Sequence, residues 1–479
     1  MKKVYLIALL LLLVGIGCKQ NTQPTGEGND STMLSTSDSI VAIIDSVAGT
    51  PADSAPFTIT LVEVTGANTP ALQSFVFGQA NGLWLMTGGR TNGFHGTSDN
   101  ESTFPTKYSN TNMFVYDPVA NKQYKMAIPE AYALQLQSTN MNYCQDGDYL
   151  YCIGGYGSNC ATDSPDCYQT FPNLTAINVP KAIAAIQAGN ATDLAAAINS
   201  ITDDRMQVTG GALHKLGDWF LLTVGQNYNT IYKGGITGIY TEQVRKFKIT
   251  NTDGVPAITD YQAIDCPFPT AEDEFNQFHR RDLTVAEAVL EDGAAGLTIF
   301  GGVFTKHGGA YANPISIGNN GNLYILHDEF SQKFNLYECA NIPMYDATTQ
   351  MMYTVLLGGI SDYYYDKNGT LMPGNPLNAL PFSNHVTTVV SKNGGAMVEY
   401  PQQTPALPAF IGSDAEFVPD ASLALYQNSE GIIDFSKLPT TGSVTLGVMY
   451  GGILATAQQS SEFNPTYASN KIYKVVLTW

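Results

Sequence analysis

The densest group of ionisable side chains in the chain lies between residues 274 and 282. It contains Glu274, His279, Arg280, Arg281 and Asp282. A carboxylate and an imidazole held among arginines can exchange protons with a substrate, because neighbouring charges and burial shift their pKa values. Glu274, His279 and Asp282 are therefore candidate catalytic residues. The alternative is a solvated connector whose opposite charges pair with one another.

Aromatic and planar polar side chains occur in several other polar stretches. Tyr rings stack on the CH faces of sugars, and Arg, His and amide groups exchange hydrogen bonds with sugar hydroxyls. The same residue types dominate protein–protein contacts, so glycan and protein ligands both stay open. The predicted ligand-binding residues are Arg90, His95, Tyr156, Tyr228, Arg280, Arg281, His307 and Tyr364.

Most of these polar stretches follow an apolar segment that ends in two glycines. The first copy runs from Leu83 to Arg90. An apolar run closed by glycines is typical of a buried strand that ends where the backbone needs a positive φ or passes close to a neighbour. Further copies lie at 149–155, 297–302, 353–359 and 444–452, with a degraded copy at 219–225. The sequence therefore predicts six copies of one structural unit.

A second hairpin follows each glycine-ended strand. Residues 314–326, for example, form two apolar runs around Asn319, Asn320 and Gly321, which supply the positive φ of a tight turn. Four strands in each of six units predict an all-β fold, a six-bladed β-propeller. In unit 2, residues 179–200 show helical spacing, which predicts a short helical insertion of two helices in place of the outer strand.

Two single strands remain at the ends of the repeats. Residues 57–64 alternate apolar and polar side chains, and residues 470–477 match the third strand of a unit that lacks a fourth. Pairing of these N- and C-terminal strands would close the ring and remove its exposed edges. In a propeller, the loops from second to third strands and the linkers between blades share one face, so we expect the ligand on that long-loop face.

The glycine-ended strands and the Tyr116, Asp117, Pro118 segment, followed by Tyr124 and Pro129, resemble the kelch-repeat family, which includes the central domain of galactose oxidase. The resemblance covers residues 57–479 and implies the propeller fold. It leaves function open, because kelch propellers include enzymes, sugar-binding proteins and interaction modules. A sugar-modifying enzyme, similar to a mutarotase or epimerase, is the alternative to a binding protein.

The first residues of the chain resemble a bacterial lipoprotein signal. Two lysines precede an apolar run from Val4 to Val14, and small residues then lead to Cys18, the expected acylated N-terminus. We expect a signal peptide at 1–17, a disordered tether at 18–56 and a propeller at 57–479. The protein is thereby predicted to be an outer-membrane lipoprotein of the cell envelope, facing the periplasm or the surface.

Charge and cysteine content narrow the partners. The chain carries 42 acidic and 23 basic side chains, and removal of residues 1–17 with their two lysines leaves 42 against 21, a net charge of −21. This balance argues against nucleic acid as a partner.

Cys160 and Cys167 lie in one polar loop and are the expected disulfide, whereas the pairing of Cys144, Cys152, Cys266 and Cys339 stays open. No metal and no cofactor are predicted.

The prediction for function is a lipid-anchored envelope propeller that binds a glycan or an envelope protein through its long-loop face. The discriminating feature is the geometry of that face. An acid, a base and an Arg that converge on one pocket would favour catalysis, whereas a broad aromatic surface would favour binding.

Overall fold

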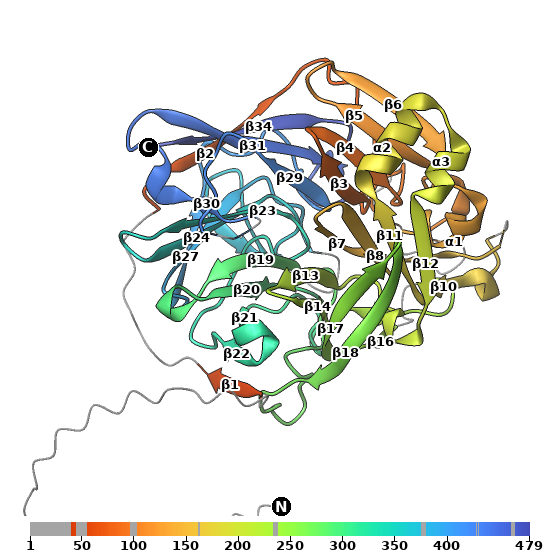
Figure 1. Ribbon diagram of the computed structural model, residues 1–479. Coiled ribbons are helices and arrows are strands. Elements are labelled where there is room, and N and C mark those ends of the chain that lie inside the picture. The colour runs from red at the N-terminus through yellow and green to blue at the C-terminus, as the bar shows by residue number, and fades with distance from the viewer. Residues whose placement is uncertain are drawn as a thin grey trace, which may run out of the picture. The chain divides into compact units, whose positions relative to one another are not determined.

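Six β-sheets surround a central axis in the computed structural model, which confirms the predicted six-bladed propeller (Figure 1). The structure describes residues 40–44, 55–95, 103–160, 163–232, 238–374, 380–427, 429, 431–460 and 465–479. The expected signal peptide at 1–17 and the acylation site Cys18 lie outside the described residues. Residues from 40 onward form one unit.

Each blade consists of four antiparallel strands, which are named in order from the axis outward. Blade 1 contains β3 (Val76–Ala80), β4 (Leu83–Thr87), β5 (Asn112–Asp117) and β6 (Lys122–Ala127). Blade 2 contains β7 (Asn142–Asp146), β8 (Tyr149–Ile153), β11 (Asn173–Asn178) and β12 (Ile198–Thr202). Blade 3 contains β13 (Ala212–Leu216), β14 (Trp219–Thr223), β17 (Gln243–Thr252) and β18 (Val255–Asp265).

The other three blades follow the same order. Blade 4 contains β19 (Thr284–Val289), β20 (Ala295–Phe300), β21 (Ile315–Gly318) and β22 (Leu323–Leu326). Blade 5 contains β23 (Ala340–Asp346), β24 (Met351–Leu357), β27 (Val386–Lys392) and β28 (Met397–Gln402), and β30 (Ile433–Asp434) adds to β23 in parallel. Blade 6 contains β29 (Ala415–Pro419), β31 (Ser443–Gly451), β34 (Ile472–Thr478) and β2 (Thr58–Glu63).

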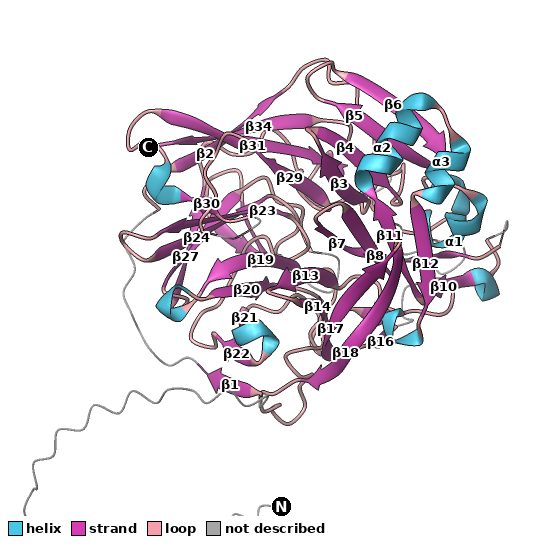
Figure 2. Ribbon diagram, in the orientation of Figure 1, coloured by secondary structure: helices cyan, strands magenta, loops and turns pink. Residues whose placement is uncertain are grey.

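Short elements occupy the loops between the second and third strands and the links between blades (Figure 2). Two-stranded hairpins are formed by β9 (Tyr156–Ser158) with β10 (Tyr168–Thr170), β15 (Gln226–Asn227) with β16 (Ile239–Tyr240), β25 (Tyr363–Tyr365) with β26 (Leu371–Pro373), and β32 (Ile453–Ala455) with β33 (Thr466–Ala468). Helix α1 spans Ala133–Leu136. Single 3-10 turns lie at Thr106–Tyr108, Glu130–Tyr132, Pro165–Cys167, Asp204–Met206, Glu291–Gly293, Asn319–Gly321 and Phe435–Lys437.

The ring is closed by strands from opposite ends of the chain, as predicted. Strand β2 is the outer strand of blade 6 and pairs antiparallel with β34, with Ile59 opposite Leu477 and Leu61 opposite Val475. All four side chains are buried. Burial of these side chains stabilises the pairing of the N-terminal strand with the last blade, by about 25 cal/mol for each Å² of apolar surface removed from water.

The glycine pair at the end of β4 shows why the repeat needs this sequence. Gly88 and Gly89 have φ values of +68° and +76°, and a Cβ atom on Gly89 would lie 2.4 Å from the carbonyl oxygen of Gln73. Residues with a side chain rarely adopt such φ values. The pair therefore lets the chain turn out of the strand while passing close to the backbone that leads into blade 1.

The helical insertion in blade 2 differs in one respect from the prediction. Helices α2 (Val179–Ala188) and α3 (Ala191–Ala196) are present, but they lie between β11 and β12 and do not replace the outer strand. The error arose because β12 follows α3 with only one residue between them, so its apolar residues continued the helical spacing. The side chains of Asn178 and Asn190 cap the two helices.

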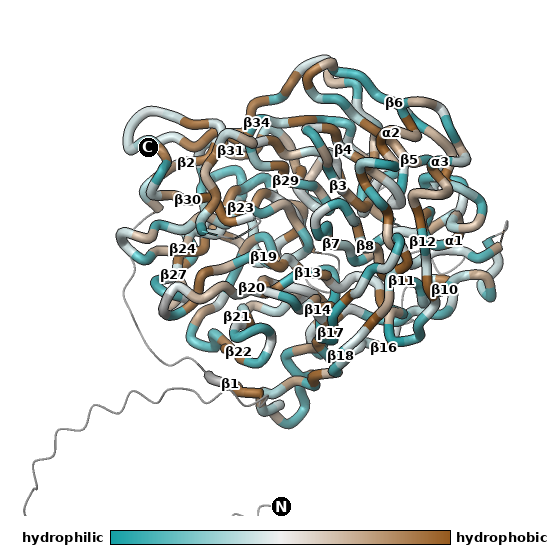
Figure 3. The backbone as a smooth tube through the Cα atoms, in the orientation of Figure 1, coloured by the Kyte–Doolittle hydropathy of each residue, from teal (hydrophilic) through white to brown (hydrophobic). Residues whose placement is uncertain are grey.

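The helices serve as packing elements. Val179, Ala182 and Ile183 of α2 are buried in one apolar cluster with Val76 and Leu85 of blade 1. The insertion therefore fills the space between two blades, which agrees with a structural role. Apolar residues also recur along the strands of the other blades, as the hydropathy colours of the backbone show (Figure 3).

A further strand lies inside the segment expected to be a tether. Strand β1 (Val41–Ile44) pairs in parallel with β22 at the outer edge of blade 4, and the amide of Val41 donates to the carbonyl of Asn322 (2.8 Å). This strand covers an edge that would otherwise expose unpaired backbone groups. Among the described residues, no helix has the length and apolar character needed to cross a membrane.

Candidate functional site

Six equivalent residues, one from each blade, form a ring across the central channel. Each directly follows a linker residue whose backbone hydrogen-bonds with the loop after the second strand of the same blade. The six residues are Ser74, Asn140, Gly210, Asp282, Glu338 and Asp414. Their backbones hydrogen-bond from blade to blade. The amide of Asp282 donates to the carbonyl of Gly210 (2.6 Å), that of Glu338 to Asp282 (3.0 Å) and that of Asp414 to Glu338 (3.1 Å).

Backbone geometry also marks the ring as a special position. Ser74, Asn140, Asp282 and Asp414 have φ values between +50° and +54°, which are uncommon for residues other than glycine. Their recurrence at equivalent places indicates that closure of the channel imposes this conformation. Three successive blades contribute carboxyl groups to the ring, and the other three contribute uncharged residues.

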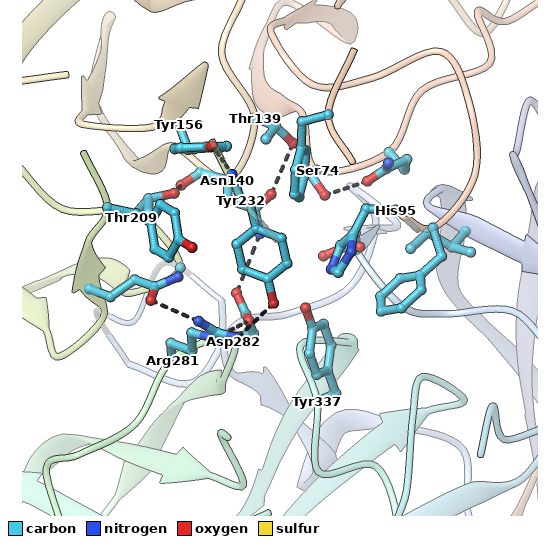
Figure 4. Close-up of a pocket in the computed structure, with 18 residues that line it drawn as sticks. Ser74, His95, Thr139, Asn140, Tyr156, Thr209, Tyr232, Arg281, Asp282 and Tyr337 are labelled. Atoms are coloured by element: carbon cyan, nitrogen blue, oxygen red, sulfur yellow. Dashed lines mark hydrogen bonds and ion pairs between the residues drawn. The ribbon is translucent and has the colours of Figure 1, made fainter. Parts of the chain in front are cut away.

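A pocket of about 50 Å³ lies on one side of the ring (Figure 4). Its residues come from the linkers between blades and the loops from second to third strands, the two kinds of segment that the sequence placed on a common face. The lining residues are Gln73, Ser74, Phe94, His95, Phe104, Thr139, Asn140, Tyr156, Thr209, Gly210, Gln226, Tyr228, Tyr232, Arg281, Asp282, Tyr337, Asp414 and Ile453. We refer to this cavity as the upper pocket.

Arg281 and Asp282 form an ion pair at the upper pocket. The Nε atom of Arg281 lies 3.2 Å from a carboxylate oxygen of Asp282, and both residues are more than nine-tenths buried. Arg281 also donates to Oε1 of Gln226 (2.7 Å) and to the hydroxyl of Tyr232 (3.1 Å). Figure 4 shows these bonds converging on the guanidinium group. Arg281 therefore holds its neighbours in place around a paired charge.

The three ring carboxyl groups are more basic than ordinary carboxyl groups. Burial raises the pKa of Asp282, although Arg281 opposes this effect. Burial and the nearby charge of Asp282 raise the pKa of Asp414 to about 7. Burial, with the charges of Asp414 and Asp282, raises the pKa of Glu338 as well. Groups with pKa values near neutrality can both give and take protons at pH 7.

Aromatic rings form one wall of the upper pocket. His95 lies between Phe94 and Phe104, with ring centres 4.4 and 4.8 Å away. Phe104 also contacts Tyr232 edge to face, at 5.5 Å. The hydroxyl of Thr103 donates to the carbonyl of Tyr232 (2.8 Å), so loops of blades 1 and 3 meet above blade 2. The wall is therefore assembled from residues far apart in the sequence.

A larger, polar cavity of about 350 Å³ lies on the other side of the ring, along the first strands of the blades. It is lined by His214, Glu287, Glu338 and Glu416, among others. Burial raises the pKa of Glu416 to about 7 and lowers that of His214 to about 4. The ring separates this channel from the upper pocket, and Glu338 belongs to the ring and faces the channel.

The candidate catalytic residues do not converge. Asp282 lines the upper pocket, but Glu274 pairs with His307 (2.9 Å) and His279 pairs with Glu242 (2.5 Å). His279 is further held between the rings of Tyr240 and Phe275, 3.8 and 3.9 Å away. Glu274 and His279 thus belong to salt-bridged surface structure, which was the alternative interpretation of this stretch.

Four of the eight predicted ligand-binding residues line the upper pocket: His95, Tyr156, Tyr228 and Arg281. Arg280 is fully buried and donates to the carbonyls of Gln277, Gly301 and Asn313, and Arg90 is buried beside Phe104. His307 is exposed, and Tyr364 belongs to strand β25 away from the pocket. Arg280 misses the pocket although Arg281 lines it, because adjacent residues of an extended segment point in opposite directions.

Sequence reasoning did not single out several residues of the pocket. These are Gln226, Tyr232, Tyr337 and Asp414, together with the uncharged members of the ring. A signal for the ring does exist: Ser74 precedes Gly88 by fourteen residues, and Asn140 precedes Gly154 by the same number. Long loops and hairpins break this spacing in blades 4 to 6, where the acidic members lie.

The expected disulfide between Cys160 and Cys167 is present, with Cα atoms 5.4 Å apart. Cys144, Cys152, Cys266 and Cys339, whose pairing the sequence left open, form no disulfide among the described residues. Within the described part of the chain, no group of three or more His, Cys, Asp or Glu side chains is arranged to hold a metal ion.

Comparisons with known proteins find matches among solved structures. No known protein family and no curated protein matches the chain. The chain is similar to the solved structure titled "Structure of YjhT", with 11% sequence identity and a TM-score of 0.42, over 87% of this chain and 100% of that chain.

Proposed function

We propose that this protein binds a saccharide in the upper pocket, as a kelch-type propeller of the cell envelope. One observation carries the proposal: residues from all six blades converge on a single pocket that combines aromatic rings, amides and the Arg281–Asp282 pair. Rings supply surfaces for sugar CH groups, and the polar groups supply donors and acceptors for hydroxyls. A small concave site favours a saccharide over a protein surface as the ligand.

The size of the pocket limits what it encloses. Its volume of about 50 Å³ is far below the roughly 300 Å³ or more that is typical of sites enclosing a whole ligand. The pocket therefore receives one substituent of the saccharide, while the rest of the ligand lies between the surrounding loops. A terminal residue of a glycan and a free monosaccharide both satisfy this geometry.

A second candidate function is a sugar-modifying reaction, such as an anomer exchange or epimerisation. The observation in its favour is the presence of Asp282 and Asp414 at one pocket, with the pKa of Asp414 raised to about 7. Ring opening of a sugar needs one group that gives a proton and one that takes a proton, and two such carboxyl groups meet that need.

One NMR experiment tests both functions. Saturation-transfer spectra of a monosaccharide panel report binding, and exchange spectra of the same samples report interconversion of anomers. We expect saturation transfer to at least one sugar. Tyr232→Ala should abolish this transfer and Tyr364→Ala should leave it unchanged, because Tyr232 lines the pocket and Tyr364 does not. Anomer exchange above the rate of the free sugar would establish the enzyme. Binding by neither panel sugars nor their oligosaccharides would contradict the proposal.

We also propose that Cys18 carries the lipid anchor that holds the propeller at the envelope. The support is the resemblance of residues 1–18 to a lipoprotein signal. Detergent-phase partitioning of the full chain expressed in a bacterium tests it: the wild type should enter the detergent phase and Cys18→Ser the aqueous phase. Equal partitioning of the two proteins would count against the anchor.

A further inference from the structure

The upper pocket contains more acidic than basic groups. Asp282 and Asp414 line it, and Glu338 adjoins them in the ring. Among the described lining residues, Arg281 is the one Arg or Lys side chain. The charge of Arg281 is already matched by Asp282, and its remaining bonds go to Gln226 and Tyr232. No Arg or Lys of the lining thus remains to compensate Asp414.

Asp414 lines the upper pocket as a buried acidic residue without a matching cation among the Arg and Lys side chains of the described lining residues. The residue is 9% exposed, and the hydroxyls of Ser74 and Ser413, which hydrogen-bond with its carboxyl group, offset only part of the effect of burial. A buried carboxylate that is not matched by a cation destabilises the folded protein. The rise in the pKa of Asp414 to about 7 has the same origin, since burial and the charge of Asp282 both disfavour the carboxylate. A cation at this point would relieve both effects.

The surroundings of Asp414 also suit a small cation. The pocket has the volume of a single substituent, and it is lined by the rings of Phe94, Phe104, Tyr228, Tyr232 and Tyr337. Aromatic faces attract ammonium groups, with a strength that increases when water is excluded. In Figure 4 the hydroxyl of Tyr337 points toward the open space between these side chains.

We propose that the ligand of the upper pocket bears a primary ammonium group, which donates to the carboxylate of Asp414 within the aromatic wall. This inference rests on the proposed function and narrows the saccharide class to amino sugars. A hydroxyl would supply one donor and no charge, whereas an ammonium group supplies three donors and the missing positive charge. Acetylation of the amine removes that charge and makes the group larger.

Isothermal titration calorimetry at pH 7.5 tests the inference with named probes. Glucosamine, galactosamine and mannosamine are each compared with the parent hexose and with the N-acetyl derivative. We expect at least one amino sugar to bind the wild-type protein 10-fold or more tightly than its two uncharged counterparts. Asp414→Asn, which keeps the shape but removes the charge, should reduce this preference to less than 2-fold.

Asp253→Asn is the matched control, because Asp253 is an exposed residue of the β17–β18 turn and its φ of +53° suits Asn equally well. It should keep the full preference. Equal binding of amino, parent and acetylated sugars by the wild type would overturn the inference and leave the saccharide site standing. A preference that persists in Asp414→Asn would also overturn it. Absence of binding by all nine sugars would contradict the saccharide site together with the inference.

Discussion

Gly210 leaves room for the carboxylate of Asp282. A Cβ atom at position 210 would lie 2.6 Å from Oδ1 of Asp282, closer than nonbonded atoms approach each other. The two residues are equivalent members of neighbouring blades, and the amide of Asp282 donates to the carbonyl of Gly210. The acidic half of the ring therefore depends on the absence of a side chain in the uncharged half.

Gly210→Ala should weaken ligand binding 10-fold or more, because the new methyl group displaces the carboxylate of Asp282 from its pair with Arg281. The substitution also carries a backbone cost of about 1–2 kcal/mol, since φ is +64°. Gly82→Ala is the control, with φ of +77° and open space around the added carbon. It should lose similar stability in thermal denaturation and keep full affinity; equal affinity of both variants would contradict the role of Gly210.

The pH dependence of stability should report on Asp414. Its folded-state pKa of about 7 lies above the ordinary value of 3.8. Between pH 3.8 and 7 the folded protein therefore holds a proton that the unfolded chain has already released. Stability contributed by this proton is present below about pH 4 and is lost as the pH rises through 7. Asp414→Asn should therefore gain stability relative to the wild type from pH 4 to 7, by up to about 4 kcal/mol.

Urea denaturation at a series of pH values measures this difference. The comparison with the wild type is needed because Glu399 and Glu416 also have pKa values raised to about 7 by burial. A difference between the two proteins that stays constant from pH 4 to 8 would show that Asp414 titrates normally.

The closing strand pair should be essential for stability. Leu477 of β34 is fully buried opposite Ile59 of β2, and Leu477→Ala should cost about 2–5 kcal/mol in chemical denaturation. Thr478→Ala, on the other face of the same strand, should cost less than about 1 kcal/mol. A loss of similar size in both variants would mean that the side-chain packing between β2 and β34 contributes little.

Arg280 should act as a structural residue despite its charge. Its guanidinium group is fully buried and donates to backbone carbonyls of three segments. Arg280→Ala leaves these acceptors without donors, so we expect a loss of about 3 kcal/mol or more in the free energy of unfolding. Arg205→Ala removes an exposed pair with Asp203 and should cost about 1 kcal/mol or less. Stability of Arg280→Ala close to that of the wild type would refute this assignment.

The disulfide should stabilise a wall of the pocket. Cys160 and Cys167 are seven residues apart, and Tyr168 next to Cys167 stacks on Tyr156 at 5.7 Å. Loop closure of this length contributes about 2–3 kcal/mol in the chain-entropy account. The double variant Cys160→Ser, Cys167→Ser should lower the melting temperature, and a reductant should lower that of the wild type to the same value. Insensitivity of the wild type to reductant would exclude this contribution.

The sequence by itself determined the repeat and its closure. Glycine pairs such as Gly88 and Gly89 report a local backbone requirement, and alternation in residues 57–64 reports one buried face, so both can be recognised without tertiary contacts. Cys160 and Cys167 could be paired from the sequence because they lie in one short loop. The helices of blade 2 were found by their spacing, but the outer strand that follows them was hidden within that spacing.

The convergence of acidic residues at the candidate site was decided by the tertiary structure. Asp282, Glu338 and Asp414 are separated by more than fifty residues along the chain, and only the closing of the ring brings their carboxyl groups together. Their raised pKa values follow from burial and from one another's charge, which no local pattern encodes. Arg280 and Arg281 are adjacent and chemically identical, and the direction of each side chain from the folded backbone makes one a structural residue and the other part of the pocket.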